Sequence, residues 1–179
     1  MNRDYTVDFE TAMTLYRERE QGSRISTGSP ELDRVIGGLN PGYFYLFYSE
    51  DKEFLDHFLQ QLIYQTIRPQ RSDTTEAIYV ICGNYRRSRT MIDSEYFLSL
   101  MIEDQIDPEY TLERIHIICA FSEKQLMRVP ELIEDFLKTR GNIEIIALQQ
   151  ITKLFYGKQA VRREDPWNFA RVISRIKEI

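Results

Sequence analysis

Four short apolar runs, separated by stretches of helical periodicity, dominate the chain from residue 43 onward. The runs are rich in β-branched and aromatic residues and span 43–48, 77–82, 115–121 and 143–148. Consecutive apolar positions of this kind are typical of parallel strands that are covered by helices on both faces. After the first run, apolar residues recur at helical spacing, as at Phe54, Phe58 and Leu62. The pattern predicts an α/β fold with a mainly parallel sheet.

Local signals indicate where several helices begin and end. Ser29 before a proline predicts the start of a short helix that stops at Gly37-Gly38, and Ser122 with Gln125 forms a capping box. Asp165 before a proline opens the last helix in the same way. These signals agree with the segmentation into strands and helices.

Composition limits the organisation of the chain. With 179 residues and 42% hydrophobic content, we expect one core domain at 24–179, preceded by an N-terminal segment at 1–23 that contains a charged helix. The apolar runs are too short to span a membrane, and the N-terminus lacks a secretory signal, so we expect a soluble intracellular protein.

The net charge and the positions of the cysteines and histidines limit the range of possible functions. A formal net charge of −5 argues against a protein that coats nucleic acid with its whole surface, so any DNA contact is expected to be local. Cys82 and Cys119 lie in strand-like runs without metal-ligand spacing and are expected to be buried free thiols. His57 and His116 fall within a helix and a strand, which favours structural roles.

The segment at 24–48 carries an ordered set of small, acidic and apolar residues, namely Ser26, Thr27, Gly28, Leu32, Asp33, Gly37 and Gly38. This set resembles the entry to the ATPase core of the RadA-type recombinases and of the KaiC-like proteins. In those families an STG-x-x-x-LD-x-x-x-GG-type run leads into the first core strand and then into the phosphate-binding loop. The resemblance implies a RecA-like core and a first core strand at 43–48.

Three further stretches resemble the RadA branch more than the KaiC-like one. Phe9 and Ala12 match the F-x-x-A tether through which these recombinases bind the next protomer. The runs at 118–127 and 151–176 resemble the third core strand with its continuation and the region around the first DNA-binding loop. The family core continues beyond this region, so the resemblance implies a core truncated at the C-terminus whose exposed surface a partner subunit covers.

The residues of the family's ATPase chemistry are replaced. The phosphate-loop positions that follow the first strand hold Ser49, Glu50, Asp51, Lys52, Glu53, Phe54, Leu55 and Asp56. In the phosphate-loop motif G-x-x-x-x-G-K-[ST], Phe54 thus occupies the position of the second glycine and Leu55 that of the lysine. Asp56 occupies the position of the hydroxyl residue that binds magnesium. Gly83 takes the position of the catalytic glutamate, and Gln149 that of the Walker B aspartate. We therefore expect a non-catalytic protein without a cofactor; an NTPase with an unorthodox site is the enzymatic alternative.

Basic residues with an aromatic neighbour remain as candidates for DNA contact. The stretch after the second strand contains Arg86, Arg87 and Arg89. The stretch that resembles the first DNA-binding loop contains Lys158, Arg162, Arg163 and Trp167. Such residues hold phosphates and stack bases in single-strand binders. Together with the replaced ATPase residues, the resemblance implies a RadA paralogue that binds a recombinase or another paralogue and modulates filament assembly on single-stranded DNA. Its expected location is cytoplasmic and nucleoid-associated in a prokaryote, or nuclear in a eukaryote. The alternative is a KaiC-like regulatory protein unconnected with DNA.

Overall fold

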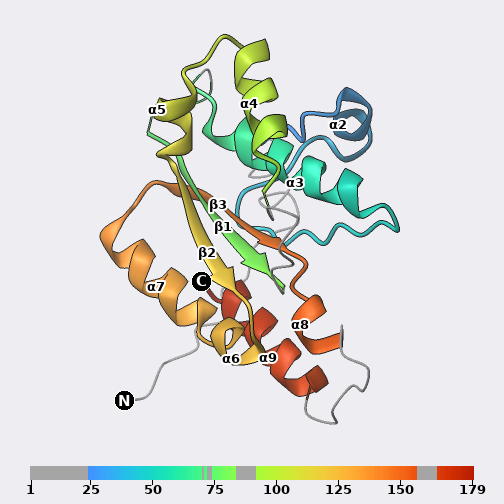
Figure 1. Ribbon diagram of the computed structural model, residues 1–179, viewed down its shortest axis with the longest axis vertical. Coiled ribbons are helices and arrows are strands. Elements are labelled where there is room, and N and C mark those ends of the chain that lie inside the picture. Colours follow the sequence, from blue (N-terminus) through green and yellow to red (C-terminus); the bar gives the residue numbers. More distant parts are fainter. Residues whose placement is uncertain (1–23, 70, 72–73, 84–91, 157–164) are drawn as a thin grey trace, which may run out of the picture.

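The computed structural model describes residues 24–69, 71, 74–83, 92–156 and 165–179 (Figure 1). Three strands and several helices make up this part of the chain. The elements are, in order, α2 (Pro30–Ile36), α3 (Lys52–Ile67), β1 (Glu76–Cys82), α4 (Ser94–Glu103), α5 (Pro108–Leu112), β2 (Ile115–Ala120), α6 (Glu123–Leu126), α7 (Val129–Thr139), β3 (Ile143–Gln149), α8 (Lys153–Tyr156) and α9 (Asp165–Lys177). The N-terminal segment at 1–23 lies outside the described residues.

The sheet is parallel, and its strand order is β2-β1-β3. The central strand β1 pairs with both neighbours, so that Ile78 lies opposite His116 on β2 and opposite Ile146 on β3. Because β1 is buried over nearly its whole length, it needs apolar residues on both faces. The α/β class and three of the four expected strands are therefore confirmed.

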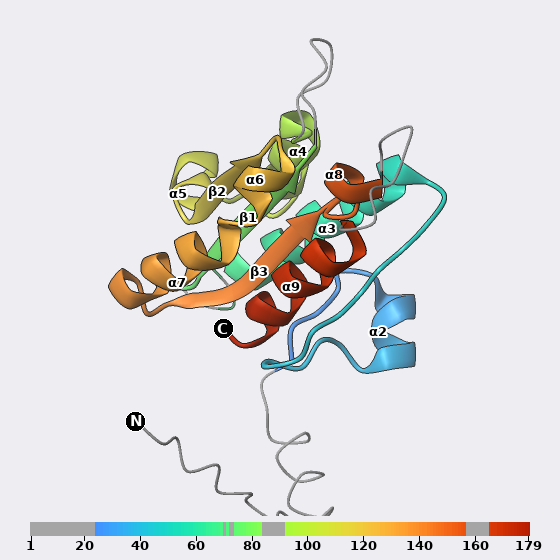
Figure 2. The same ribbon diagram turned by 90° about the horizontal axis from the view of Figure 1, so that it is seen from below.

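Helices cover both faces of the sheet, as the apolar runs predict (Figure 2). On one face, Ile78, Val80 and Cys82 of β1 pack against buried residues of α6, α7, α8 and α9. On the other face, Tyr79 and Ile81 pack against α3 and α4. Alternate residues of a single strand thus contribute to two separate hydrophobic clusters, since successive side chains of a strand point to opposite faces.

The prediction of a strand at 43–48 is wrong. In the described structure this segment has no strand pairing, although Phe47 packs edge-on against Phe58 with ring centroids 4.9 Å apart. The Tyr45 hydroxyl accepts a hydrogen bond from the Asn40 backbone, and Leu46 and Tyr48 are 76% and 90% exposed. The aromatic and aliphatic composition favours a strand, but a strand also requires a neighbour for its backbone hydrogen bonds, and here contacts between rings hold the segment instead.

The helix boundaries follow the local signals. Ser29 caps α2, whose C-cap Gly37 adopts a left-handed conformation, and Ser122 caps α6.

Cys82 is buried as expected, and burial raises the pKa of its thiol to about 12. Cys119 is exposed, contrary to expectation, because it lies on the edge strand β2, where Ile117 is exposed as well. Within the described residues, no helix is both long and apolar enough to cross a membrane.

Candidate functional site

A hydrogen-bonded unit forms around Asp33 ahead of α3. The Asp33 carboxylate accepts hydrogen bonds from the Ser26 hydroxyl at 2.6 Å, from the Thr27 backbone N–H at 2.9 Å and from the Thr27 hydroxyl at 2.7 Å. Burial alone would raise the pKa of Asp33, but these three donors outweigh it and hold the pKa below its usual value. The serine, threonine and aspartate of the 24–48 motif are thus joined in one structural unit.

Gly28 ties this unit to α3. Its φ of +80° is a left-handed conformation, and a Cβ atom placed there would lie 2.3 Å from Nε2 of Gln61. The Gln61 amide donates a hydrogen bond to the Gly28 carbonyl at 2.8 Å. Only glycine allows both the backbone conformation and this close approach. The motif therefore positions α3, whose first turns include residues that the resemblance assigns to the phosphate loop.

The first turn of α3 has an ordinary helix N-cap. Asp51 adopts an extended conformation, and its side chain accepts a hydrogen bond from the Phe54 backbone N–H at 3.0 Å. The Ser49 hydroxyl accepts a hydrogen bond from Asp51 N at 3.1 Å. Glu50, Lys52 and Glu53 are exposed, whereas Leu55 is half-buried. The carboxylate of Asp51 therefore satisfies the helix N-terminus from within the chain.

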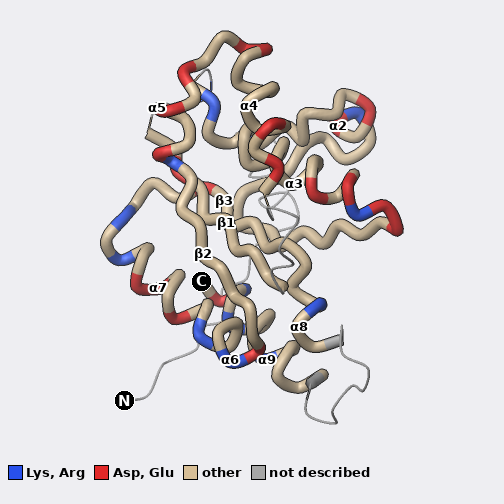
Figure 3. The backbone as a smooth tube through the Cα atoms, in the orientation of Figure 1, with Lys and Arg blue, Asp and Glu red and all other residues tan. Residues whose placement is uncertain are grey.

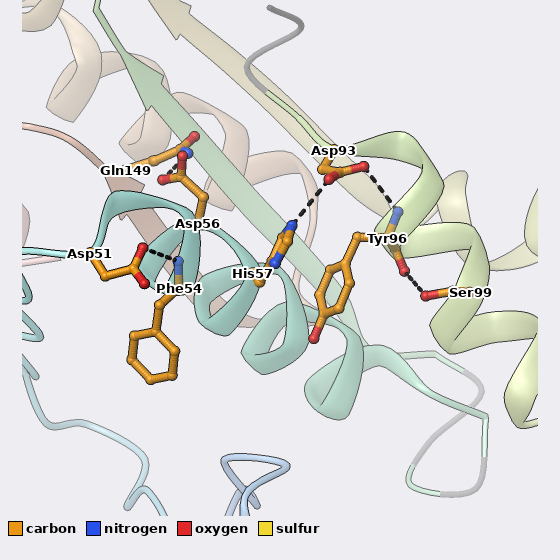
Figure 4. Close-up of polar contacts among 8 residues, drawn as sticks. All are labelled: Asp51, Phe54, Asp56, His57, Asp93, Tyr96, Ser99 and Gln149. Atoms are coloured by element: carbon orange, nitrogen blue, oxygen red, sulfur yellow. Dashed lines mark hydrogen bonds and ion pairs between the residues drawn. The ribbon is translucent and has the colours of Figure 1, made fainter.

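Two of the residues that the resemblance assigns to the ATPase site contact each other directly. The Gln149 amide at the end of β3 donates a hydrogen bond to Asp56 Oδ1 at 2.6 Å, and the Tyr79 hydroxyl of β1 donates to Gln149 Oε1 at 2.8 Å. Figure 4 shows Asp56 and Gln149 pointing toward each other from α3 and β3. Burial and the negative charge of Asp56 raise the pKa of Tyr79, so its hydroxyl stays protonated and available as a donor. We call these three residues the Asp56 network.

Gly83 lies directly beyond β1 and faces a lysine. Its backbone N–H donates to the Ala120 carbonyl at 3.1 Å, and a Cβ atom at Gly83 would lie 3.0 Å from the Lys153 side chain. Lys153 begins α8 and donates to the Gln150 side chain at 3.0 Å. The position that the resemblance assigns to the catalytic glutamate thus has no side chain and lies beside a cationic one.

A histidine and an aspartate join α3 to α4. His57 Nε2 lies 3.0 Å from Asp93 Oδ2, and the His57 ring stacks on Tyr96 with centroids 4.2 Å apart. A hydrogen bond from the Tyr96 backbone N–H and the contact with His57 lower the pKa of Asp93. The helical position of His57 was predicted correctly, but the sequence gave no signal for its partner Asp93, which lies 36 residues away.

The remaining predicted residues divide into two groups. Trp167 lies in the first turn of α9, and its side chain is 79% exposed. The other candidates lie outside the described residues: Phe9, Ala12, Arg86, Arg87, Arg89, Lys158, Arg162 and Arg163. In the part of the chain that the structure describes, no group of three or more histidine, cysteine, aspartate or glutamate side chains is arranged to hold a metal ion.

Comparison with known proteins relates the chain to recombinases. The DNA repair and recombination protein RadA of Methanococcus maripaludis strain C6 is 24% identical over 193 residues, which cover 97% of this chain and 58% of that RadA. RadA of strain C7 shows the same identity and coverage, and RadA of strain C5 is 23% identical. No protein-family model matches the chain. The chain thus spans 58% of the length of these curated relatives.

The similarity supports a distant relationship of the chain to the RadA/RecA-type recombinase superfamily. The coverage includes almost all of this chain, in agreement with the resemblance read from its separate motifs. The parallel sheet with helices on both faces is consistent with a RecA-like core.

Proposed function

We propose that the chain is a non-catalytic relative of the RadA recombinases that acts in recombinational DNA repair. In this role it binds a RadA-type recombinase or a recombinase paralogue and modulates filament assembly on single-stranded DNA. The similarity to proteins named for DNA repair and recombination supports the repair context. The binding role follows from the replaced ATPase residues, because a subunit that does not turn over nucleotide still occupies a position in an assembly.

The contact between Asp56 and Gln149 carries this proposal. In a phosphate-loop ATPase, a hydroxyl at the first position and an aspartate at the second organise a magnesium ion between helix and strand. Here a carboxylate and an amide at these positions bond to each other at 2.6 Å. The polar groups that would face a metal are thereby satisfied within the chain, and Glu50 and Glu53 add negative charge nearby. A triphosphate would have to break this contact and approach like charges.

The proposed tether gives the first test. Phe9→Ala should weaken the complex with the RadA-type recombinase of the same organism by about 30-fold or more, because a buried aromatic anchor is a typical interface hot spot. The complex is measured with purified proteins by co-purification and by biolayer interferometry. Tyr5→Ala, in the same segment but outside the F-x-x-A motif, is the matched control and should bind as the wild type does. Absence of any complex with the recombinase or with its paralogues would contradict the proposed function.

Trp167 allows a test of direct DNA contact. Trp167→Ala should weaken binding to a fluorescein-labelled oligothymidylate by about 5- to 150-fold, since stacking of one base on an aromatic ring contributes about 1–3 kcal/mol. The unfolding free energy should change by less than about 0.5 kcal/mol, because the ring is 79% exposed. Tyr48→Ala removes another exposed aromatic ring and serves as the control in the same anisotropy measurement. Equal affinities of the two variants and the wild type would exclude Trp167 from the DNA contact.

A further inference from the structure

A groove of about 470 Å³ lies between α2, α3 and the start of α4, beside the replaced phosphate-loop positions. Its lining comes from all three helices and consists of Ser29, Glu31, Leu32, Val35, Phe54, His57, Phe58, Gln61 and Tyr96. Phe54 and Asp56 point to different sides of α3, so the Phe54 ring lines the groove while Asp56 reaches Gln149 (Figure 4). The groove is thus separate from the Asp56 network.

The apolar side chains of the groove are unusually open to solvent. Val35 on α2 is 81% exposed and Phe54 on α3 is 57% exposed, whereas Phe58 forms a buried floor next to Phe54. Exposed apolar side chains that gather around a concavity are typical of surfaces that bind another molecule. Burial of these two side chains against a partner would remove apolar surface from water and favour association.

One wall of the groove is fixed before any partner binds. The Tyr96 ring stacks on His57, and His57 is held in turn by Asp93, which also caps α4. The opposite wall is tied to α3 through the hydrogen bond between Gln61 and Gly28. Preformed walls lower the entropic cost of binding, because fewer side chains must be ordered when the partner arrives.

Among the residues that the structure describes, the charges close to the groove are mainly negative. Glu31 lines the groove, and Glu53 and Glu95 are the chain neighbours of the lining residues Phe54 and Tyr96. Lys52 and Arg34 are the basic residues within α2 and the first turn of α3 (Figure 3). An apolar groove with this rim favours an occupant that brings positive charge and disfavours nucleotides and other anions.

We propose that this groove binds a segment of the partner protein that inserts an apolar side chain and carries lysine or arginine beside it. The inference rests on the proposed function, since the partner is taken to be the RadA-type recombinase or a paralogue. A volume of about 470 Å³ accommodates one or two large side chains. The apolar insertion supplies affinity, and the acidic rim selects the charge of the segment.

Site-specific photo-crosslinking tests the occupant. Val35 is replaced by p-benzoylphenylalanine, and the full chain is irradiated in complex with the purified recombinase of the same organism. Leu132 on α7, which is 46% exposed and lies on the side of the sheet opposite α3, receives the same replacement as the control. The crosslink from position 35 should map to a recombinase segment in which an apolar residue adjoins lysine or arginine, and position 132 should give none. A crosslink to a segment without basic residues would overturn the proposal.

Affinity measurements separate the groove from the proposed function. Phe54→Ala and Glu53→Lys should each weaken the complex at least about tenfold, whereas Leu132→Ala should leave it unchanged. The loss from Glu53→Lys should shrink at high salt, and that from Phe54→Ala should persist. If the complex forms but neither groove variant weakens it, the groove proposal fails and the proposed function stands. If the wild-type chain forms no complex, both fail.

Discussion

Replacement of Asp33 by alanine is expected to lower the free energy of unfolding by about 3–4 kcal/mol. The substitution removes the acceptor of three hydrogen bonds from Ser26 and Thr27, and Thr27 is fully buried. A buried donor that loses its acceptor retains its desolvation cost, which explains why the expected loss exceeds that of a surface contact. Urea unfolding followed by circular dichroism measures the change.

A matched variant and the pH dependence check this interpretation. Arg34→Ala, the next residue on α2, should cost less than about 1 kcal/mol, because Arg34 is exposed. Since the pKa of Asp33 is lowered in the folded protein, its contribution is present above the ordinary carboxyl pKa of about 4 and is lost as the pH falls through the lower folded pKa. The difference between wild type and Asp33→Ala should therefore be full at neutral pH and should decrease in acid. A loss below about 1 kcal/mol at neutral pH would refute the role of Asp33.

Asp56→Ala should destabilise the fold by about 2–3 kcal/mol. The Gln149 side chain is only 4% exposed, and without Asp56 its amide group loses its closest acceptor. Asp56→Asn keeps an oxygen acceptor at the same position and should cost less than about 1 kcal/mol. The pair of variants thus distinguishes the hydrogen bond from the negative charge.

A double-mutant cycle with Gln149→Ala measures the contact itself. Asp56→Ala and Gln149→Ala should be coupled by about 1 kcal/mol or more in chemical unfolding experiments. Leu132→Ala, far from both residues, should combine additively with Asp56→Ala. Additivity between the Asp56 and Gln149 variants would show that the 2.6 Å contact contributes nothing to stability.

The strands show how far the sequence determines the fold. The runs that became β1, β2 and β3 were predictable because each is apolar at consecutive positions and ends at a turn or helix signal. Residues 43–48 carry an equally strong pattern but form no strand, because pairing depends on a neighbour that local composition does not specify. The exposure of Cys119 was missed for a related reason: the sequence does not reveal which strand lies at the edge of the sheet.

The sequence singled out residues of the candidate site but did not reveal their contacts. The phosphate-loop comparison singled out Asp56 and Gln149, and the fold brings these two residues together. Tyr79 and Lys153 were missed, because a strand tyrosine and a lysine after a strand carry no distinctive pattern and acquire meaning only through the register of β1 with β3. The groove was missed likewise, since it depends on how α2 and α4 pack beside α3.

Equilibrium dialysis against labelled ATP with magnesium tests whether the chain works without nucleotide. The RadA-type recombinase of the same organism, dialysed in parallel, provides the positive control. Because Asp56 is bonded to Gln149 and Glu50 and Glu53 add negative charge in the same segment, we expect no saturable binding of ATP to this chain up to millimolar concentration. Saturable, stoichiometric binding of ATP would contradict the proposal that the chain works without nucleotide.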